Sequence, residues 1–365
     1  MKNKGMILNI MELSRLIGIS SREFRIIEYL KDQLSKTEYD ISIDNIGNLL
    51  IGYKDNDNAR KNVLLFAHMD EIGMIVRKID DNGFIYFERL GGVNTQILPG
   101  TRLLLDGNQG MIRGVVGVQS HHFMPSEKKF VIPALNQLYI DIGVESREEA
   151  NERGIDVGTY IAFDADCEIV NDKYLRGKSL DNRMAVGVLV ELARCLDNKV
   201  LPYNLYICFP VMEEFNIRGI LPVIRKIKPD IAIGLDITPS CDTPDLDYND
   251  ISLEGGPAIT CMNFHGGGTL AGVLPDKDLY DMINDQAKIL NIHLQKEVSP
   301  GVITENAFSI FENHEGIKVA NLSIPTRYTH TPFETAAISD INELLEVLKR
   351  VLELGLPSLI QKGGK

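Results

Sequence analysis

The sequence predicts an α/β protein with a mixed, mostly parallel sheet flanked by helices and a small β module inserted in the chain. Uniformly apolar stretches such as 63–67 are typical of strands buried on both faces of a sheet. They alternate with stretches of helical periodicity such as 182–196, which favours a largely parallel or mixed sheet. Between about 73 and 163, short alternating stretches are separated by glycine and Asp-Gly turns, which indicates strands with little helix.

The patterns place each element in order. They predict two short helices within 10–34, a hairpin of 39–43 and 49–53, a strand at 63–67, a short helix at 148–153 and a long one at 182–196, strands at 205–211 and 231–235, a helix at 277–290, a strand at 319–324 and a last helix at 341–352. Asp340 and Glu343 are a candidate capping box for that last helix.

The length of the chain predicts two domains. At 365 residues it can form one large core and a second module. We expect 1–71 and 165–365 to form the α/β domain and 72–164 to form an inserted β domain.

Charge and composition exclude several classes of function. The formal net charge of −13 argues against nucleic acid as a partner, because phosphate binding needs concentrated lysine and arginine. No stretch has the length and apolarity of a membrane span. Residues 1–9 carry two lysines but no sustained apolar run or small-residue cleavage site, so we expect no signal peptide. Five widely spaced cysteines without a Cys-x-x-Cys pair predict reduced, mostly buried thiols. We therefore expect a cytoplasmic protein that does not bind membranes.

Acidic and imidazole side chains follow the predicted strands where each strand ends. His68 and Asp70 follow one strand, Glu213 and Glu214 follow the next, Asp236 follows a third, and His330 comes after the strand that closes at 324. Ligands bind at the carboxyl ends of strands in open α/β sheets. Asp181 stands at the start of a helix, where exposed amides favour an anion.

Two imidazoles and three carboxylates suit zinc and similar cations, and two metal ions could use this set only by sharing a carboxylate. Each residue also has a simpler explanation. The pair His68 and Asp70 could lie on the surface, Glu213 and Glu214 could be solvated, and Asp181 could cap its helix. Asp236 could form a turn and His330 could pack in a loop. The order and spacing of the whole set are more specific than any member.

That ordered set closely resembles the glutamyl and tetrahedral aminopeptidase family of two-metal peptidases, some of whose members have been described as endoglucanases. The matching residues are Ala67-His68-Met69-Asp70-Glu71-Ile72-Gly73, Lys178-Ser179-Leu180-Asp181-Asn182-Arg183, Glu213-Glu214 with Arg218-Gly219, Asp236 with Asp242-Thr243-Pro244, and Pro325-Thr326-Arg327-Tyr328-Thr329-His330. The similarity extends over nearly the whole chain.

The resemblance implies roles for these residues. It implies that His68 and Asp236 hold one metal ion, that Glu214 and His330 hold the other, that Asp181 bridges them, that Glu213 is the general base, and that Asp70 orients His68. It also implies that 1–71 and 165–365 form a phosphorylase/hydrolase-like α/β catalytic domain, and that 72–164 form a PDZ-like β-barrel that acts in assembly or as a lid. The oligomer that it implies is a homo-oligomer, often a dodecamer. The cofactors would be two divalent metal ions per subunit, zinc first, with cobalt or manganese as alternatives.

The chain departs from the family pattern at three places. Residues 302–307 replace the usual Gly-Gly-Thr-Asp-Ala, the stretch 212–216 replaces Gln-Glu-Glu-Val-Gly, and the glycine-rich stretch 263–269 has no familiar counterpart. The first of these regions contributes to the substrate pocket in the family, and in the third we interpret His265 as a loop residue.

We therefore expect a metal-dependent aminopeptidase that releases N-terminal residues from peptides. A deacylase or another amidohydrolase on the same fold is the alternative within enzymes. A glycosidase is disfavoured, because it would use a pair of carboxylates that flank a sugar and would have no role for the two histidines. A non-catalytic, metal-stabilised scaffold also remains open, although Glu213 would have no use there.

Overall fold

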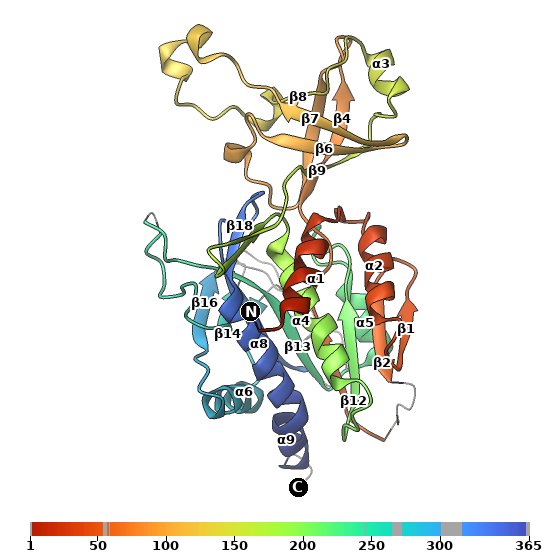
Figure 1. The fold of residues 1–365 in the computed structure, drawn as a ribbon, viewed down its shortest axis with the longest axis vertical. Coiled ribbons are helices and arrows are strands. Elements are labelled where there is room, and N and C mark those ends of the chain that lie inside the picture. Colours follow the sequence, from red (N-terminus) through yellow and green to blue (C-terminus); the bar gives the residue numbers. More distant parts are fainter. Residues whose placement is uncertain are drawn as a thin grey trace.

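The computed structural model describes residues 2–53, 57, 59–244, 246–264, 272–300 and 316–362. An α/β body carries a smaller β-barrel stacked on one end of it (Figure 1). The sequence departure at 302–307 and residues 265–269 of the glycine-rich stretch lie outside the described residues.

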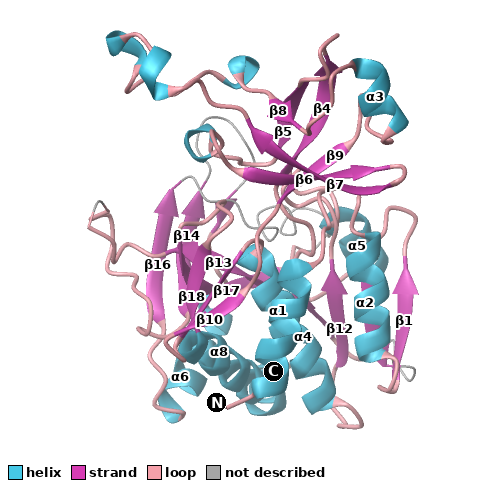
Figure 2. Cartoon of the chain, turned by 45° about the horizontal axis from the view of Figure 1, so that its top comes forward, coloured by secondary structure: helices cyan, strands magenta, loops and turns pink. Residues whose placement is uncertain are grey.

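A mixed twelve-stranded sheet forms the centre of the body (Figure 2). The prediction of a mixed sheet is confirmed, but most of its strand pairs are antiparallel rather than parallel, because antiparallel strands flank the parallel centre. Its main path runs β1-β2-β12-β3-β13-β17-β18-β11-β10, and β14 joins β17 and carries β15 and β16. The four central strands, β12, β3, β13 and β17, are parallel, while the strands outside them in the main path pair antiparallel. The strands are β1 (Tyr39–Ile43), β2 (Leu49–Tyr53), β3 (Asn62–Phe66), β10 (Glu168–Val170), β11 (Tyr174–Gly177), β12 (Asn204–Phe209), β13 (Ile231–Pro239), β14 (Ala258–Phe264), β15 (Gly272–Val273), β16 (Gln295–Pro300), β17 (Lys318–Arg327) and β18 (Glu334–Ala337).

Helices bury both faces of the sheet. Alternate residues of β3 point to opposite faces: Val63 and Leu65 join a core with α1, α2, α4, α6 and α8, whereas Leu64 and Phe66 join a core with α5. This two-sided burial explains why the strand is uniformly apolar. The helices are α1 (Lys4–Arg15), α2 (Phe24–Leu34), α4 (Leu180–Leu196), α5 (Ile220–Ile227), α6 (Lys277–Ile289), α8 (Ile338–Arg350) and α9 (Leu356–Lys362), with a π-helical turn (Val351–Gly355) between the last two.

The inserted segment closes into a six-stranded barrel in the order β4-β5-β8-β7-β6-β9. Its interior holds its own apolar core, separate from the cores of the body. One short helix, α3 (Arg147–Glu152), lies close to the predicted position. The barrel strands are β4 (Gly73–Ile79), β5 (Ile85–Leu90), β6 (Arg102–Gly107), β7 (Gly110–Val116), β8 (Ile140–Asp141) and β9 (Tyr160–Phe163).

Some predicted boundaries need correction. The first helix begins at Lys4 rather than at residue 10, and α5 was not predicted. The predicted capping box is wrong: the N-cap position of α8 is Ala337, and no side chain caps that helix end. The buried carboxylate of Asp340 instead accepts hydrogen bonds from the backbone amides of Glu254 (3.0 Å) and Gly256 (3.3 Å). Asp340 therefore fixes a loop from another part of the chain.

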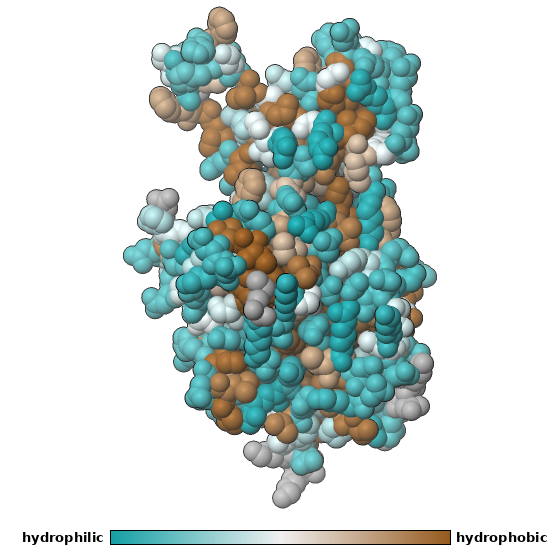
Figure 3. All heavy atoms as spheres, viewed as in Figure 1, coloured by the Kyte–Doolittle hydropathy of each residue, from teal (hydrophilic) through white to brown (hydrophobic). Residues whose placement is uncertain are grey.

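The surface view is mainly hydrophilic on the face drawn in Figure 3, with apolar side chains in separate patches. Within the described part of the chain, no helix combines the length and the apolar character that a bilayer crossing requires. All five cysteines are free, but only Cys167 and Cys208 are buried. The prediction that most of the thiols are buried is therefore wrong.

Candidate metal centre

The predicted ligand residues come together at the end of the sheet on which the barrel sits. Three overlapping groups have ligand atoms within 4.8 Å of one another: His68, Asp181 and Asp236; Asp181, Glu214 and His330; and His68, Glu213 and Glu214. The central strands are parallel, so their carboxyl ends meet at one edge, which is why residues far apart in the sequence converge here.

Asp181 lies at the centre of the cluster. Its Oδ1 is 3.2 Å from Nε2 of His68, and its Oδ2 is 3.3 Å from Nε2 of His330. Nε2 of His330 is also 3.3 Å from Oε1 of Glu214, and Nε2 of His68 is 3.8 Å from Oδ1 of Asp236. One carboxylate thus stands between two separate imidazole and carboxylate pairs.

Burial rules out the simpler explanations for two residue pairs. The side chains of His68 and Asp70 are 3% and 0% exposed, so they are not a surface pair. Those of Glu213 and Glu214 are 11% and 7% exposed, so they are not solvated carboxylates. Charged groups buried to this degree require partners.

The start of α4 departs from a regular helix and directs Asp181 into the cluster. Asp181 and Asn182 have non-helical backbone angles, and the peptide bond between them is cis. Both carboxylate oxygens of Asp181 face imidazole nitrogens, so Asp181 serves the cluster and not as a helix cap. The side-chain amide of Asn182 donates to the carbonyl of Leu235 (2.8 Å), which fastens this turn to β13 beside Asp236.

Asp236 lies within β13 and not at its end, which corrects the prediction. The strand continues to Pro239, and Asp236 is in register with Ser323 of β17. The prediction stopped the strand early, because the polar residues Asp236 and Thr238 interrupt the apolar run, although both are largely buried.

Asp70 contacts other parts of the cluster besides His68. Its Oδ1 is 3.4 Å from Nδ1 of His68, too long for a strong hydrogen bond. The same carboxylate accepts hydrogen bonds from the backbone amides of Glu213 (2.9 Å) and Glu214 (3.1 Å). The hydroxyl of Ser20 donates to it at 2.6 Å. Asp70 therefore ties the turn that carries both glutamates to the segment that carries His68.

Glu71 and Lys178, two other residues of the matching motifs, form a buried support beneath the cluster. Nζ of Lys178 donates to Oε2 of Glu71 at 2.7 Å, and the hydroxyl of Ser179 donates to the same oxygen. The other carboxylate oxygen accepts from the backbone amide of Gly18 at 2.8 Å. These contacts fasten the start of α4 to the chain just after His68.

Glu334 is a site residue that the sequence did not reveal. It lies at the start of β18 and is 2% exposed. Its Oε1 accepts from the backbone amide of His330 (2.8 Å), and its Oε2 accepts from that of Asp181 (3.0 Å). His330 has a positive φ of 61°, a conformation that costs free energy in a residue with a side chain. Glu334 therefore holds the backbones of two candidate ligands together.

Replacing Glu334 by glutamine is expected to weaken metal binding. Glutamine keeps the size of the side chain but offers one acceptor oxygen for two amide donors, so either His330 or Asp181 loses its support. We expect a loss of metal affinity of roughly 10–100-fold, which competition with a chelator would measure. Glu152→Gln, on the exposed end of α3, is the control. Unchanged affinity in Glu334→Gln would show that these two hydrogen bonds are dispensable.

The cluster carries an excess of negative charge. Burial, and then the charge of Asp181, raise the pKa values of Asp236 and Glu334 to about 8. Burial disfavours a charged His330, but contacts with Asp181 and Glu214 prevail and raise its pKa to about 12. Burial alone would raise the pKa of Asp181, yet the two imidazoles lower it. These shifts are those expected where carboxylates crowd without enough positive charge.

The residues fit divalent metal ions. Their donors are imidazole nitrogens and carboxylate oxygens, the types that zinc, cobalt and manganese accept. Bound cations would offset the excess negative charge that the pKa shifts report. The predicted ligands already lie close enough together to hold such ions, so no further residues are needed as ligands.

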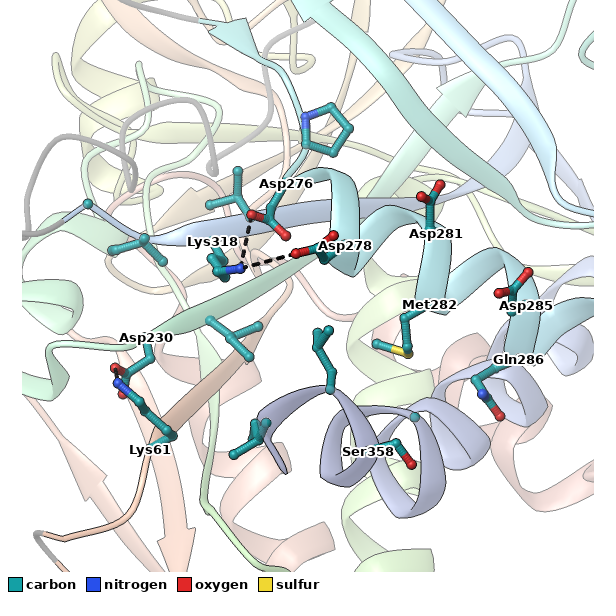
Figure 4. Close-up of a pocket in the computed structure, with 18 of the residues that line it drawn as sticks. Lys61, Asp230, Asp276, Asp278, Asp281, Met282, Asp285, Gln286, Lys318 and Ser358 are labelled. Carbon is teal, nitrogen blue, oxygen red and sulfur yellow. Dashed lines mark hydrogen bonds and ion pairs between the residues drawn. The ribbon is translucent and has the colours of Figure 1, made fainter. Parts of the chain in front are cut away.

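A cavity of about 1050 Å³ lies elsewhere in the body (Figure 4). It is bordered by Lys61, Asp230 and Lys318, which stand at the amino ends of three central strands, and by acidic residues of α6. None of the predicted site residues lines it, so the candidate site is the cluster at the opposite end of the parallel strands.

Known proteins resemble this chain over most of its length. The family model of the M42 glutamyl aminopeptidases matches residues 47–347. The protein SgcX of Escherichia coli K12 is 39% identical over 91% of this chain and 89% of its own length. The lysyl aminopeptidase of Pyrococcus furiosus is 29% identical over 92% of this chain and 93% of its own. The TET1 peptidase of Pyrococcus horikoshii, which can assemble into a tetrahedron or a large octahedral shell, superposes with a TM-score of 0.84 at 27% identity, over 96% of this chain and 100% of its own.

Proposed function

The chain belongs to the M42 glutamyl aminopeptidase family, and we propose that it is a dinuclear metal-dependent aminopeptidase that releases N-terminal residues from peptides. The observation that carries this proposal is the position of Asp181, whose two oxygens face two separate imidazoles. A carboxylate shared in this way is what two neighbouring metal ions require.

We assign a role to each residue of the cluster. His68 and Asp236 would hold one ion, Glu214 and His330 the other, and Asp181 both. When bound, such ions supply Lewis acidity, which lowers the pKa of water and polarises a carbonyl oxygen. Zinc is the first candidate, and cobalt or manganese could use the same donors.

Glu213 is the proposed general base. Its Oε2 lies 3.9 Å from Nε2 of His68, so it borders the ligand set without belonging to the pairs around Asp181. Its carboxylate would take a proton from the attacking water and give it to the leaving amine, so that water is added across the peptide bond and the carboxylate is regenerated. Asp70 would keep Glu213 in place, because its carboxylate accepts a hydrogen bond from the backbone amide of Glu213.

A substrate panel tests the activity. Protein stripped of metal and reloaded with zinc, cobalt or manganese is expected to release single N-terminal residues from free-amine peptides and nothing from their N-acetylated counterparts. Amino-acid analysis of the products would measure this release. Removal of the acetyl group with the peptide left whole would instead identify a deacylase, and internal cleavage would contradict an aminopeptidase.

We also propose that the chain forms a homo-oligomer through the inserted barrel. The segment between β7 and β8 projects from the barrel (yellow in Figure 1). It exposes large apolar side chains. Phe123 is 82% exposed and Phe130 is 94% exposed. Exposed apolar groups of this size favour burial against a partner, and TET1 of Pyrococcus horikoshii can assemble into a tetrahedron or a large octahedral shell.

We propose the cytoplasm as the location of the protein. Its five cysteines are free thiols, which is the usual state of cysteines in a reducing compartment.

A further inference from the structure

The barrel reaches into the metal centre through two glycines. Gly91 and Gly92 follow β5, and the carbonyl oxygen of Gly92 lies 3.1 Å from Nδ1 of His330. A carbonyl oxygen can only accept a hydrogen bond, so Nδ1 must carry the proton. A neutral His330 is then left with its lone pair on Nε2, the nitrogen that faces Asp181 and Glu214. The contact therefore selects the tautomer and ring orientation that a metal ligand needs.

The approach is too close for any residue other than glycine. A Cβ atom on Gly92 would lie 2.5 Å from Nδ1 and 2.7 Å from Cε1 of His330. A Cβ atom on Gly91 would lie 2.8 Å from Ile72 and 3.2 Å from Oε2 of Glu214, and Gly91 has a φ of 82°. The two glycines thus pack against both members of one candidate ligand pair.

Contacts outside the cluster set where the barrel sits on the body. Arg25 of α2 makes two hydrogen bonds of 2.9 Å to the carboxylate of Asp106 on β6. The hydroxyls of Ser21 and Tyr160 are 2.9 Å apart, and the guanidinium of Arg22 lies 4.4 Å from the centre of the Tyr160 ring. We call these contacts the barrel seat. Because Gly92 belongs to the barrel and His330 to the body, their distance depends on this seat.

We propose that the inserted barrel is a working part of the metal centre, in which Gly92 positions His330 and the barrel seat holds Gly92 in place. The inference rests on the proposed function, because it takes His330 to be a metal ligand. It assigns to the barrel a second role besides assembly: the ion held by Glu214 and His330 depends on the barrel, whereas the ion held by His68 and Asp236 does not.

Titration with Co²⁺ tests this inference on the full chain. Metal-stripped Gly92→Ala is expected to bind one Co²⁺ with the affinity of the unaltered protein and the other roughly 10–100-fold more weakly. Its visible Co²⁺ absorption is expected to change as well, because that spectrum depends on the number and geometry of the ligands. Gly5→Ala in α1, where an added Cβ meets nothing within 4 Å, is the matched control.

A second pair of variants decides the matter if Gly92→Ala does not fold. Asp106→Asn weakens the barrel seat away from the cluster, and Asp81→Asn removes an exposed barrel ion pair with Arg147 (2.7 Å) as its control. We expect a smaller loss of affinity for the same ion in Asp106→Asn only. If Gly92→Ala binds two ions with unaltered affinity, the inference is overturned but the proposed function stands. If Gly92→Ala is unfolded, two ions bound with unaltered affinity by Asp106→Asn have the same meaning. An unaltered protein that binds no Co²⁺ overturns the inference and the proposed function together.

Discussion

Replacing Glu213 by glutamine is expected to lower kcat by about 10²–10⁴-fold while two metal ions stay bound. Glutamine has nearly the same shape as glutamate, but its amide cannot take a proton from water at neutral pH. The backbone amide of residue 213 still donates to Asp70 in the variant, so the turn keeps its anchor. The loss therefore falls on proton transfer and not on the fold.

Steady-state kinetics and metal analysis of the same sample separate the possible outcomes for Glu213→Gln. Glu152→Gln on the exposed end of α3 should retain full activity and metal content. A Glu213→Gln variant that keeps most of its activity contradicts the role of general base. If the variant loses a metal ion, the result identifies Glu213 as a metal ligand. This outcome has to be tested because the ligand atoms of Glu213 lie close to those of His68 and Glu214.

The sequence predicted the mixed sheet, the inserted β module and the convergence of the cluster because these depend on regular patterns, whereas the barrel form of the module was expected only from the family resemblance. Parallel strands bring their carboxyl ends to one edge, so polar residues at the ends of separate apolar stretches could be expected to meet. His68 and Glu214 were found in this way. Asp236 was also predicted as a site residue, although the strand was predicted to end at 235. The error in the strand end had no effect on this prediction, because β13 continues past Asp236 to Pro239 and Asp236 still lies in the cluster.

Glu334 and Gly92 were missed for a physical reason. Each contact has a backbone group on one side: the side-chain carboxylate of Glu334 accepts hydrogen bonds from two backbone amides, and the backbone carbonyl of Gly92 faces the His330 imidazole. The backbone groups of a residue are the same whatever its side chain, so no residue pattern marks such a contact in advance. Glu334 follows His330 by four residues, but an acidic residue at that distance is by itself unremarkable.

The departure at 212–216 has a structural explanation. Asn216 has a φ of 73°, in the left-handed region. Glycine adopts this conformation most readily, and asparagine tolerates it better than most other residues. Asparagine can therefore stand where the family usually has glycine without displacing Glu213 and Glu214.

Metal removal is expected to abolish peptide hydrolysis, because without cations the four carboxylates and two imidazoles of the cluster have nothing to polarise a carbonyl. A metal-stripped sample titrated with Zn²⁺, while release of N-terminal residues is followed, tests the central claim most directly. We predict no activity above background at the start and full activity at two equivalents of Zn²⁺ per chain. Full activity in the stripped protein, or a plateau at one equivalent, would contradict a centre in which Asp181 joins two metal ions.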